Sequence, residues 1–463
     1  MKLQNKILFL IIVPLQFLLA QNSQPFLKDF DNLKIAKVPL IGKWLGPRDI
    51  FKHRLRTLAK WQKSNPLEMY QELRDFRPVA NMSKIPGLKL GINSPDTIYL
   101  SKRVDIIETM EQPGIFTVLP YSRKMKALGG HMLAADETDF NNIEKPWMRS
   151  LMPHSDIAKI KIILEEIINE TLKEISVKKT GLTDFNLVDD FARKVPAKFA
   201  DKYFGFPGPD LKTLYRWSRT TQENYFHNLR NNKKIIKRSK NSEQEMVKYG
   251  QKLLSNPETL VEDSILKRLL LSNEVARNEI TEERVLVNII GAIIGSIETT
   301  QTAFIYALQE LSRRPHFFEL AKIAAKNNDD EKLAQLIWEA LRFNPINPAM
   351  VRVAIKDAVV GKASGHPREI KKGTLILLGI QSAMFDESQI ENPREFRIDR
   401  PYEINLNFGY GHHRCLGEMI NLIQLPLMIK KMILQKNFQL LPEAKKKKSK
   451  SPFPENLRAQ FLI

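Results

Sequence analysis

Apolar residues recur every three or four positions over long stretches of this chain, a spacing that predicts helices with one or more buried faces. Such stretches cover residues 157–175, 282–311, 331–343 and 416–434. The second is too apolar at its centre for a surface helix. The third stops at Asn344-Pro345, since proline does not continue a helix. The first shows the spacing most clearly, at Ile160, Ile163, Leu164, Ile167 and Ile168.

A smaller β portion is predicted between the last two helices. Residues 350–360, residues 373–378 and the stretch around Phe396 are short and rich in β-forming residues, with Gly and Pro between them. At 463 residues the chain can bury a large core, as one large domain or as two or three smaller ones. We see no internal repeat and no linker within residues 21–463. The prediction is therefore a single large domain, mainly α with a smaller β portion.

The first twenty residues form a separate hydrophobic segment. Lys2 and Lys6 precede an apolar run from Ile7 to Ala20. As a helix this run spans about 21 Å, short of the roughly 30 Å hydrocarbon core of a bilayer. A basic start, a short apolar stretch and Ala20 before polar residues fit a secretory signal cleaved near Ala20. The alternative is an uncleaved membrane-associating segment at residues 1–20.

The only cysteine, Cys415, lies in the glycine-rich string FGYGHHRCLG at residues 408–417. A single thiol excludes a disulfide within the chain and any all-cysteine zinc or iron–sulfur site. Free cysteines are often no more than small buried apolar residues. A lone thiolate among glycines can also be the one protein ligand of a haem iron. We expect Gly409, Gly411 and Gly417 to take positive φ, which lets the backbone approach a flat macrocycle.

The string resembles the haem-ligand signature F-G-x-G-x-[HR]-x-C-x-G of the cytochrome P-450 family. The resemblance implies haem b as cofactor and Cys415 as the axial thiolate. It implies that His413 contacts a haem propionate and that Phe408, Gly409 and Gly411 belong to the cofactor site. It also implies a P-450-like fold around a buried haem. Many membrane-bound members begin with an apolar segment followed by a basic, Pro-rich stretch like residues 38–47, so we favour membrane attachment over cleavage.

An acid and two hydroxyls interrupt the apolar helix predicted at residues 282–311, in Gly295-Ser296-Ile297-Glu298-Thr299-Thr300. A buried Glu is costly unless it has a partner, so Glu298 needs a reason to be there. Ser and Thr can bond back to the preceding turn and loosen a helix, which would open a notch. The segment resembles the family's [AG]-G-x-[DE]-T-T, with Ser296 in place of Gly. The resemblance implies that Glu298 and Thr299 are the proton-delivery pair for cleaving the O–O bond.

Two further constellations resemble family motifs. Glu339 and Arg342 stand three apart among apolar residues, as in the family's E-x-x-R, and an ordinary surface pair is the alternative. The third partner of this structural ion pair is expected to be Arg400, with Arg394 as the alternative. Arg352 resembles the family's strand Arg that pairs with a haem propionate.

The resemblance is thin where the family supplies a His and an Arg to the haem. After Asp136 the pattern fails, because Phe140 stands where His is common and the next Arg is Arg149. Arg149, together with Trp147, is therefore our prediction for the propionate contact. A second departure follows the cysteine string. There Asn421 and Gln424 replace the usual Ala and Glu.

Composition limits the partners. With 43% hydrophobic and 27% charged residues the chain is globular. A net charge of +20 suits nucleic acid, an anionic membrane or an acidic protein. The basic runs at residues 233–240 and 445–448 are interpreted as solvated loops. No nucleic-acid-reading motif accompanies them, so we expect no nucleic-acid partner.

Together these features imply an oxidoreductase, a haem-thiolate monooxygenase that puts one oxygen atom of O2 into a lipophilic small molecule. The sequence has no flavin, NAD or iron–sulfur segment, so electrons are expected from a partner. That partner is a ferredoxin or flavodoxin with its reductase, or a diflavin reductase. One alternative is a haem-thiolate peroxygenase or isomerase, and Glu298 and Thr299 speak against both. The other is a non-catalytic haem-binding sensor.

Overall fold

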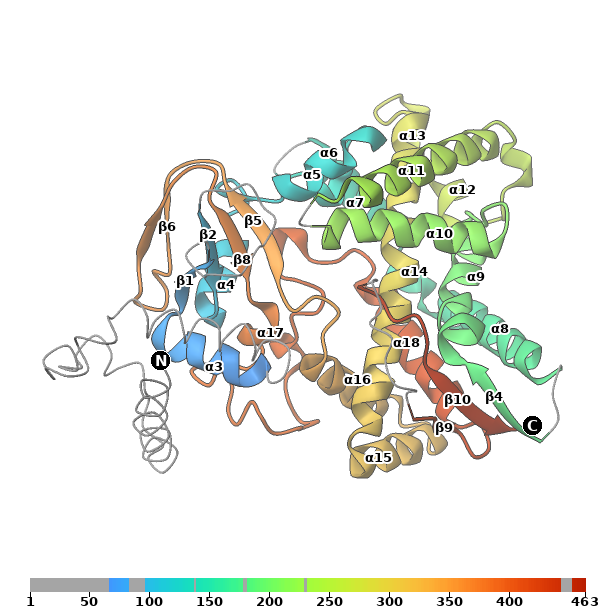
Figure 1. Ribbon diagram of the computed structural model, residues 1–463. Helices are drawn as coiled ribbons and strands as arrows, with labels where there is room; N and C mark the ends of the chain where they lie inside the picture. Colours follow the sequence, from blue (N-terminus) through green and yellow to red (C-terminus); the bar gives the residue numbers. More distant parts are fainter. Residues whose placement is uncertain (1–65, 83–95, 137–138, 178–180, 229–230, 443–451) are drawn as a thin grey trace, which may run out of the picture.

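The computed structural model describes residues 66–82, 96–136, 139–177, 181–228, 231–442 and 452–463. The predicted segment at residues 1–20 and the basic run at 445–448 lie outside these residues. Helices fill one side of the molecule, and the largest sheet lies on the other with short helices beside it (Figure 1). This confirms the prediction of a mainly α fold with a smaller β portion.

The four helices predicted from apolar spacing are all present. They are α8 (Ile157–Ser176), α14 (Glu282–Ser312), α16 (Asp330–Phe343) and α18 (Glu418–Ile433). The other helices in the described part of the chain are α3 (Pro66–Phe76), α4 (Arg103–Met110), α5 (Leu119–Met125), α6 (Asp139–Asn142), α7 (Glu144–Ser150), α9 (Lys194–Lys202), α10 (Leu211–Gln222), α11 (Lys233–Leu254), α12 (Ile265–Leu270), α13 (Asn273–Ala276), α15 (Pro315–Lys326) and α17 (Ile380–Ala383).

The long helix α14 runs through the middle of the helical side (Figure 1). The Thr281 side chain caps its start by accepting from the backbone N–H of Arg284, and two glutamates in the first turn suit the helix dipole. Among the described residues it is the one helix long and apolar enough to cross a membrane. Most of its apolar surface is instead buried against α9, α10, α16 and α18, as expected of a core helix.

A five-stranded sheet forms the main β portion, in the order β1-β2-β8-β5-β3. Strand β2 pairs with β8 in parallel, and the other neighbours pair antiparallel. Its strands are β1 (Val79–Asn81), β2 (Thr97–Leu100), β3 (Phe116–Thr117), β5 (Met350–Ala354) and β8 (Leu375–Leu378). Two smaller sheets contain β4 (Leu182–Asn186), β9 (Gln439–Leu440) and β10 (Arg458–Leu462), and β6 (Ala358–Val360) with β7 (Arg368–Ile370).

Two local predictions were wrong. The stretch around Phe396 is not a strand, because arginine side chains bind its backbone carbonyls, including that of Glu395, in place of a neighbouring strand. Residues 233–240 begin helix α11 and are not a loop. The Asn232 side chain caps that helix, and Ser239 and Met246 face inward at helical spacing while the lysines face solvent. The buried residues at helical spacing therefore decide the local structure, and the run of lysines does not prevent a helix.

Candidate active site

The cysteine string forms a tight loop that ends at the start of α18. Gly409 and Gly411 have φ values of +73° and +62°, in the left-handed region that favours glycine. Gly417 has φ −83°, so the expected positive φ there was wrong. The backbone N–H of Cys415 donates to the Phe408 carbonyl at 2.8 Å, which closes the loop. The Phe408 ring packs on Trp338 of α16, with ring centroids 5.4 Å apart.

The Cys415 side chain is exposed at a point that protein surrounds closely. Burial by these surroundings raises the pKa of the thiol. The backbone N–H of Gly417 and the positive charges of Lys145 and Arg149 act in the opposite direction and favour the thiolate. The thiol is thus accessible and has donors and cations near it.

One face of α14 is open in the middle of this otherwise buried helix. Gly295 is exposed, and Ala292, Ser296 and Thr299 are half-buried at three- and four-residue spacing. A Cβ added at Gly295 would meet no atom within 4 Å. The Thr299 hydroxyl donates to the Gly295 carbonyl, the back-bonding expected to loosen the helix here.

At one end of this open face the His131 imidazole lies directly against Gly291 of α14. A Cβ at Gly291 would fall 1.8 Å from the His131 Nε2. Burial lowers the pKa of His131 to about 4, so the imidazole is neutral at physiological pH.

A short chain of hydrogen bonds links α14 to the cysteine loop. The Thr300 hydroxyl donates to the Asn421 Oδ1 at 3.0 Å, and the Asn421 Nδ2 donates to the Gly417 carbonyl at 3.1 Å. Asn421 is one of the two departures from the family motif. Here it holds α18 and the cysteine loop against α14.

The Glu298 side chain does not lie on the open face. It is fully buried, and its Oε1 lies 3.3 Å from the Nε of Arg193, which precedes α9. Arg193 also bonds Asp189 at 2.6 Å. Burial raises the pKa of the Glu298 carboxyl, and the charges of Arg193 and Arg219 oppose that rise. The sequence offered no signal for Arg193 beyond its i,i+4 spacing to Asp189.

Arg352, His413 and Asp136 meet at the side of the cysteine loop. Arg352 is buried on β5 and makes one hydrogen bond to the described residues, from Nη1 to the Val351 carbonyl at 2.9 Å. The His413 Nε2 lies 3.1 Å from the Asp136 Oδ1, and Asp136 also accepts from the backbone N–H of Val118. Arg352 thus keeps guanidinium donors for a further acceptor.

Helix α7 brings two cations close to the cysteine loop, the predicted Arg149 and also Lys145. Arg149 is exposed, and the Trp147 indole points elsewhere, donating to the Ser272 hydroxyl at 3.2 Å. Lys145 is buried instead and donates to the His412 carbonyl in the cysteine loop. Burial lowers the pKa of Lys145 to about 8. Sequence reasoning missed Lys145 because lysine is rarely buried.

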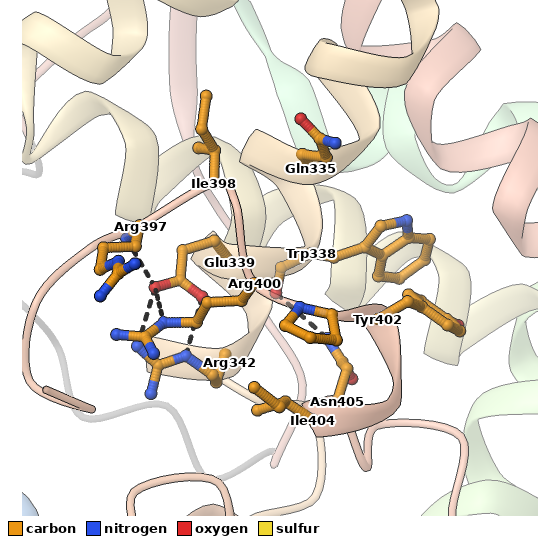
Figure 2. A pocket seen from close by; sticks show the side chains of 11 residues that line it. Gln335, Trp338, Glu339, Arg342, Arg397, Ile398, Arg400, Tyr402, Ile404 and Asn405 are labelled. Carbon is orange, nitrogen blue, oxygen red and sulfur yellow. Dashed lines mark hydrogen bonds and ion pairs between the residues drawn. The ribbon is translucent and has the colours of Figure 1, made fainter. Parts of the chain in front are cut away.

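A buried ion-pair cluster supports the cysteine loop from α16 (Figure 2). The Glu339 carboxylate accepts from Arg342 Nε and Nη2, both at 2.8 Å, and from the backbone N–H of Arg397 at 2.9 Å. Arg400 Nε lies 3.4 Å from the same carboxylate and donates to three backbone carbonyls. Arg394 lies elsewhere and bonds Glu68 and Gln71.

These residues fit a haem. An accessible thiol, an open small-residue face on α14 and cations with spare donors are what a flat, iron-bearing dicarboxylate needs. The described residues contain no group of three His, Cys, Asp or Glu side chains that could hold a metal ion. A single thiolate is enough when a macrocycle supplies the other ligands.

Comparison with known proteins gives a consistent picture. The family model for Cytochrome P450 matches residues 198–460. A protein of Bacillus subtilis named "Cytochrome P450" is 24% identical over 405 residues, covering 84% of this chain and 92% of that protein. The steroid C26-monooxygenase of Mycolicibacterium smegmatis is 30% identical over 165 residues, 36% of this chain and 39% of that protein. The structure of CYP109E1 from Bacillus megaterium with testosterone superposes with a TM-score of 0.69 at 20% identity, covering 86% of this chain and all of that one.

Replacing Glu339 with Gln is expected to destabilise the protein by about 3–5 kcal/mol, because it leaves two buried guanidinium groups without their counter-charge. The free energy of unfolding by denaturant titration measures this. The matched control is Glu319→Gln on α15, which removes an exposed carboxylate paired with Lys322 and should change little. Equal effects of the two variants would contradict the structural role of the cluster.

Proposed function

This chain belongs to the cytochrome P450 family, and from that premise we propose which of its residues carry out the reaction. It is an oxidoreductase, a haem-dependent monooxygenase. The observation that carries the residue assignments is the accessible Cys415 thiol beside the open face of α14, held to that helix through Asn421. The function requires a thiolate ligand and room for O2 and substrate, and Cys415 and the open face of α14 would supply them.

Cys415 would hold haem b through its thiolate, and the cofactor would supply the iron chemistry that activates O2. Arg352 and His413 would donate to the propionates, and the loop glycines would let the backbone lie close to the ring. The His413 contact to Asp136 orients the imidazole for this task. Phe408 packs on Trp338 and so fixes the loop from the outside.

Glu298 and Thr299 deliver protons. The Thr299 hydroxyl lies on the open face, where it can donate to oxygen and accept from water. The raised pKa of Glu298 lets that carboxyl hold a proton closer to neutral pH than an ordinary glutamate does. Arg193 holds the carboxylate on the far side of the helix. Proton transfer to Thr299 therefore passes through water or follows a rotation of the Glu298 side chain away from Arg193.

The substrate is a lipophilic small molecule. The open face of α14 consists of Ala, Gly, Ser and Thr, which leave volume for an apolar ligand and offer few charges to bind a polar one. Relatives named for steroids agree with this class, among them the steroid C26-monooxygenase and the CYP109E1 structures with testosterone and corticosterone.

Electrons come from an acidic donor, a ferredoxin or flavodoxin with its reductase, or a diflavin reductase. The net charge of +20 suits such a partner, and Arg149 exposes a positive charge on α7, close to the cysteine loop. Steering by charge weakens as salt rises. A reduction rate that stays constant between low and high ionic strength for every donor would contradict this choice.

The test of the function is the carbon-monoxide spectrum of the reduced protein together with its turnover. Wild type should give the thiolate-type Soret band, and Cys415→Ser should lose it. Turnover should need both O2 and a reductant. Turnover on peroxide alone, or without any oxidant, would point to a peroxygenase or isomerase, and a thiolate-bound haem that oxidises nothing in a broad panel would point to a sensor.

Glu298→Gln should lower product formation about 100-fold, since the amide cannot release a proton. Thr299→Val should let electron and O2 consumption continue while less product forms. Product, O2 and reductant are measured in the same assay. Glu283→Gln, an exposed acid at the start of α14, is the control and should match wild type. Undiminished product yield in both site variants would exclude the proton-delivery role.

Residues 1–20 attach the protein to a membrane surface without being cleaved. The basic start and the short apolar run support this. Fractionation of cells that express the full chain should place it with membranes, and deletion of residues 1–20 should release it. Amino-terminal sequencing that begins after Ala20 would show the alternative, an exported protein.

A further inference from the structure

Lys145 is a buried cation with no counter-anion among the described residues. Its exposed fraction is 5%, and it makes no ion pair with any described acid. Burying an ammonium group is costly unless an anion or several acceptors compensate for the lost water. An ammonium has three donors, and the described residues supply Lys145 with one acceptor, the His412 carbonyl.

The position of Lys145 is fixed by the residue before it. Arg284 of α14 binds the Glu144 carboxylate through Nε at 2.6 Å and Nη2 at 2.8 Å. Asn288, one turn further along α14, donates to the same carboxylate at 2.7 Å. Arg284 also donates to the carbonyls of Gly129 and Gly130. The first turn of α7 is therefore fastened to the core helix, and the Lys145 side chain leaves it toward the cysteine loop.

That loop is where an anion forms. His412, whose carbonyl accepts from Lys145, lies three residues before Cys415 in the cysteine loop. Cofactor binding brings two kinds of anion to this place, the thiolate sulfur and the propionate carboxylates. Both would meet a positive charge that is already desolvated and held in position.

We propose that Lys145 is a positioning residue of the cofactor site, holding the cysteine loop from α7 and acting as the counter-cation of the bound haem-thiolate unit. The inference rests on the proposed function, because the anion exists only if haem binds through Cys415. It adds a second cation of α7 to the site, one turn before the predicted Arg149.

Three variants separate charge from packing. Lys145→Arg keeps the charge, Lys145→Gln keeps a donor for the His412 carbonyl without charge, and Lys145→Met keeps the apolar stem alone. Lys161→Met, an exposed lysine of α8 without an ion pair, is the control. Each holoprotein is followed for haem transfer to excess apomyoglobin and for conversion of its reduced carbon-monoxide band from the thiolate to the thiol type, with circular dichroism as a check on folding.

Lys145→Gln and Lys145→Met should lose haem, or the thiolate-type band, about 10- to 100-fold faster than wild type. Lys145→Arg and Lys161→Met should stay near the wild-type rate. Faster band conversion at an unchanged release rate identifies the thiolate as the partner, and faster release with an intact band identifies the propionates. Should Lys145→Met fail to fold, the Gln variant decides the question.

A Gln variant that matches wild type in both measurements overturns the inference. Wild type with no thiolate-type band would instead contradict the proposed function. The two failures are therefore distinguishable.

Discussion

The position of the cysteine loop depends on the hydrogen bonds and ion pairs of the Glu339 carboxylate. Glu339 lies on α16, and in one place its carboxylate binds the side chains of Arg342 and Arg400 and the backbone N–H of Arg397 (Figure 2). The side chains of Arg342 and Arg400 donate hydrogen bonds to backbone carbonyls of the irregular segment at 391–400, which has no neighbouring strand to bind them. The segment leads directly into the loop at 408–417. A ligand that must hold an iron at a fixed position needs such a rigid base, since the loop itself has little regular structure.

Helix α14 meets two opposing demands. Its apolar residues form the centre of the core, and its open face must stay free of large side chains. Small residues at three- and four-residue spacing meet both demands. They keep one face of the helix open, and the large apolar residues lie on its other faces. The buried Glu298 is the exception, and Arg193 partly compensates for its burial. The nearest atoms of the pair form no hydrogen bond, which would suit the proton exchange proposed for this carboxyl.

Much of this arrangement follows from residue types and spacing. Helical period located α8, α14, α16 and α18, and the family motif pointed to Glu339, Arg342 and Arg400, which the fold brings together. What could not be predicted depends on contacts between segments far apart in the chain. The direction of Glu298 follows from Arg193, more than a hundred residues earlier. The burial of Lys145 follows from the fastening of Glu144 to Arg284, which no local pattern records.

The hydrogen bonds from Thr300 through Asn421 to Gly417 have a mechanical consequence. They hold α14 and the cysteine loop at a fixed distance from each other on one side of the site. A bulky ligand cannot gain room there without breaking them. Any motion that admits a ligand would then be taken up by elements other than α14 and the cysteine loop. The side-chain amide of Asn421, at a position where alanine is usual in the family, thus keeps this side of the site fixed.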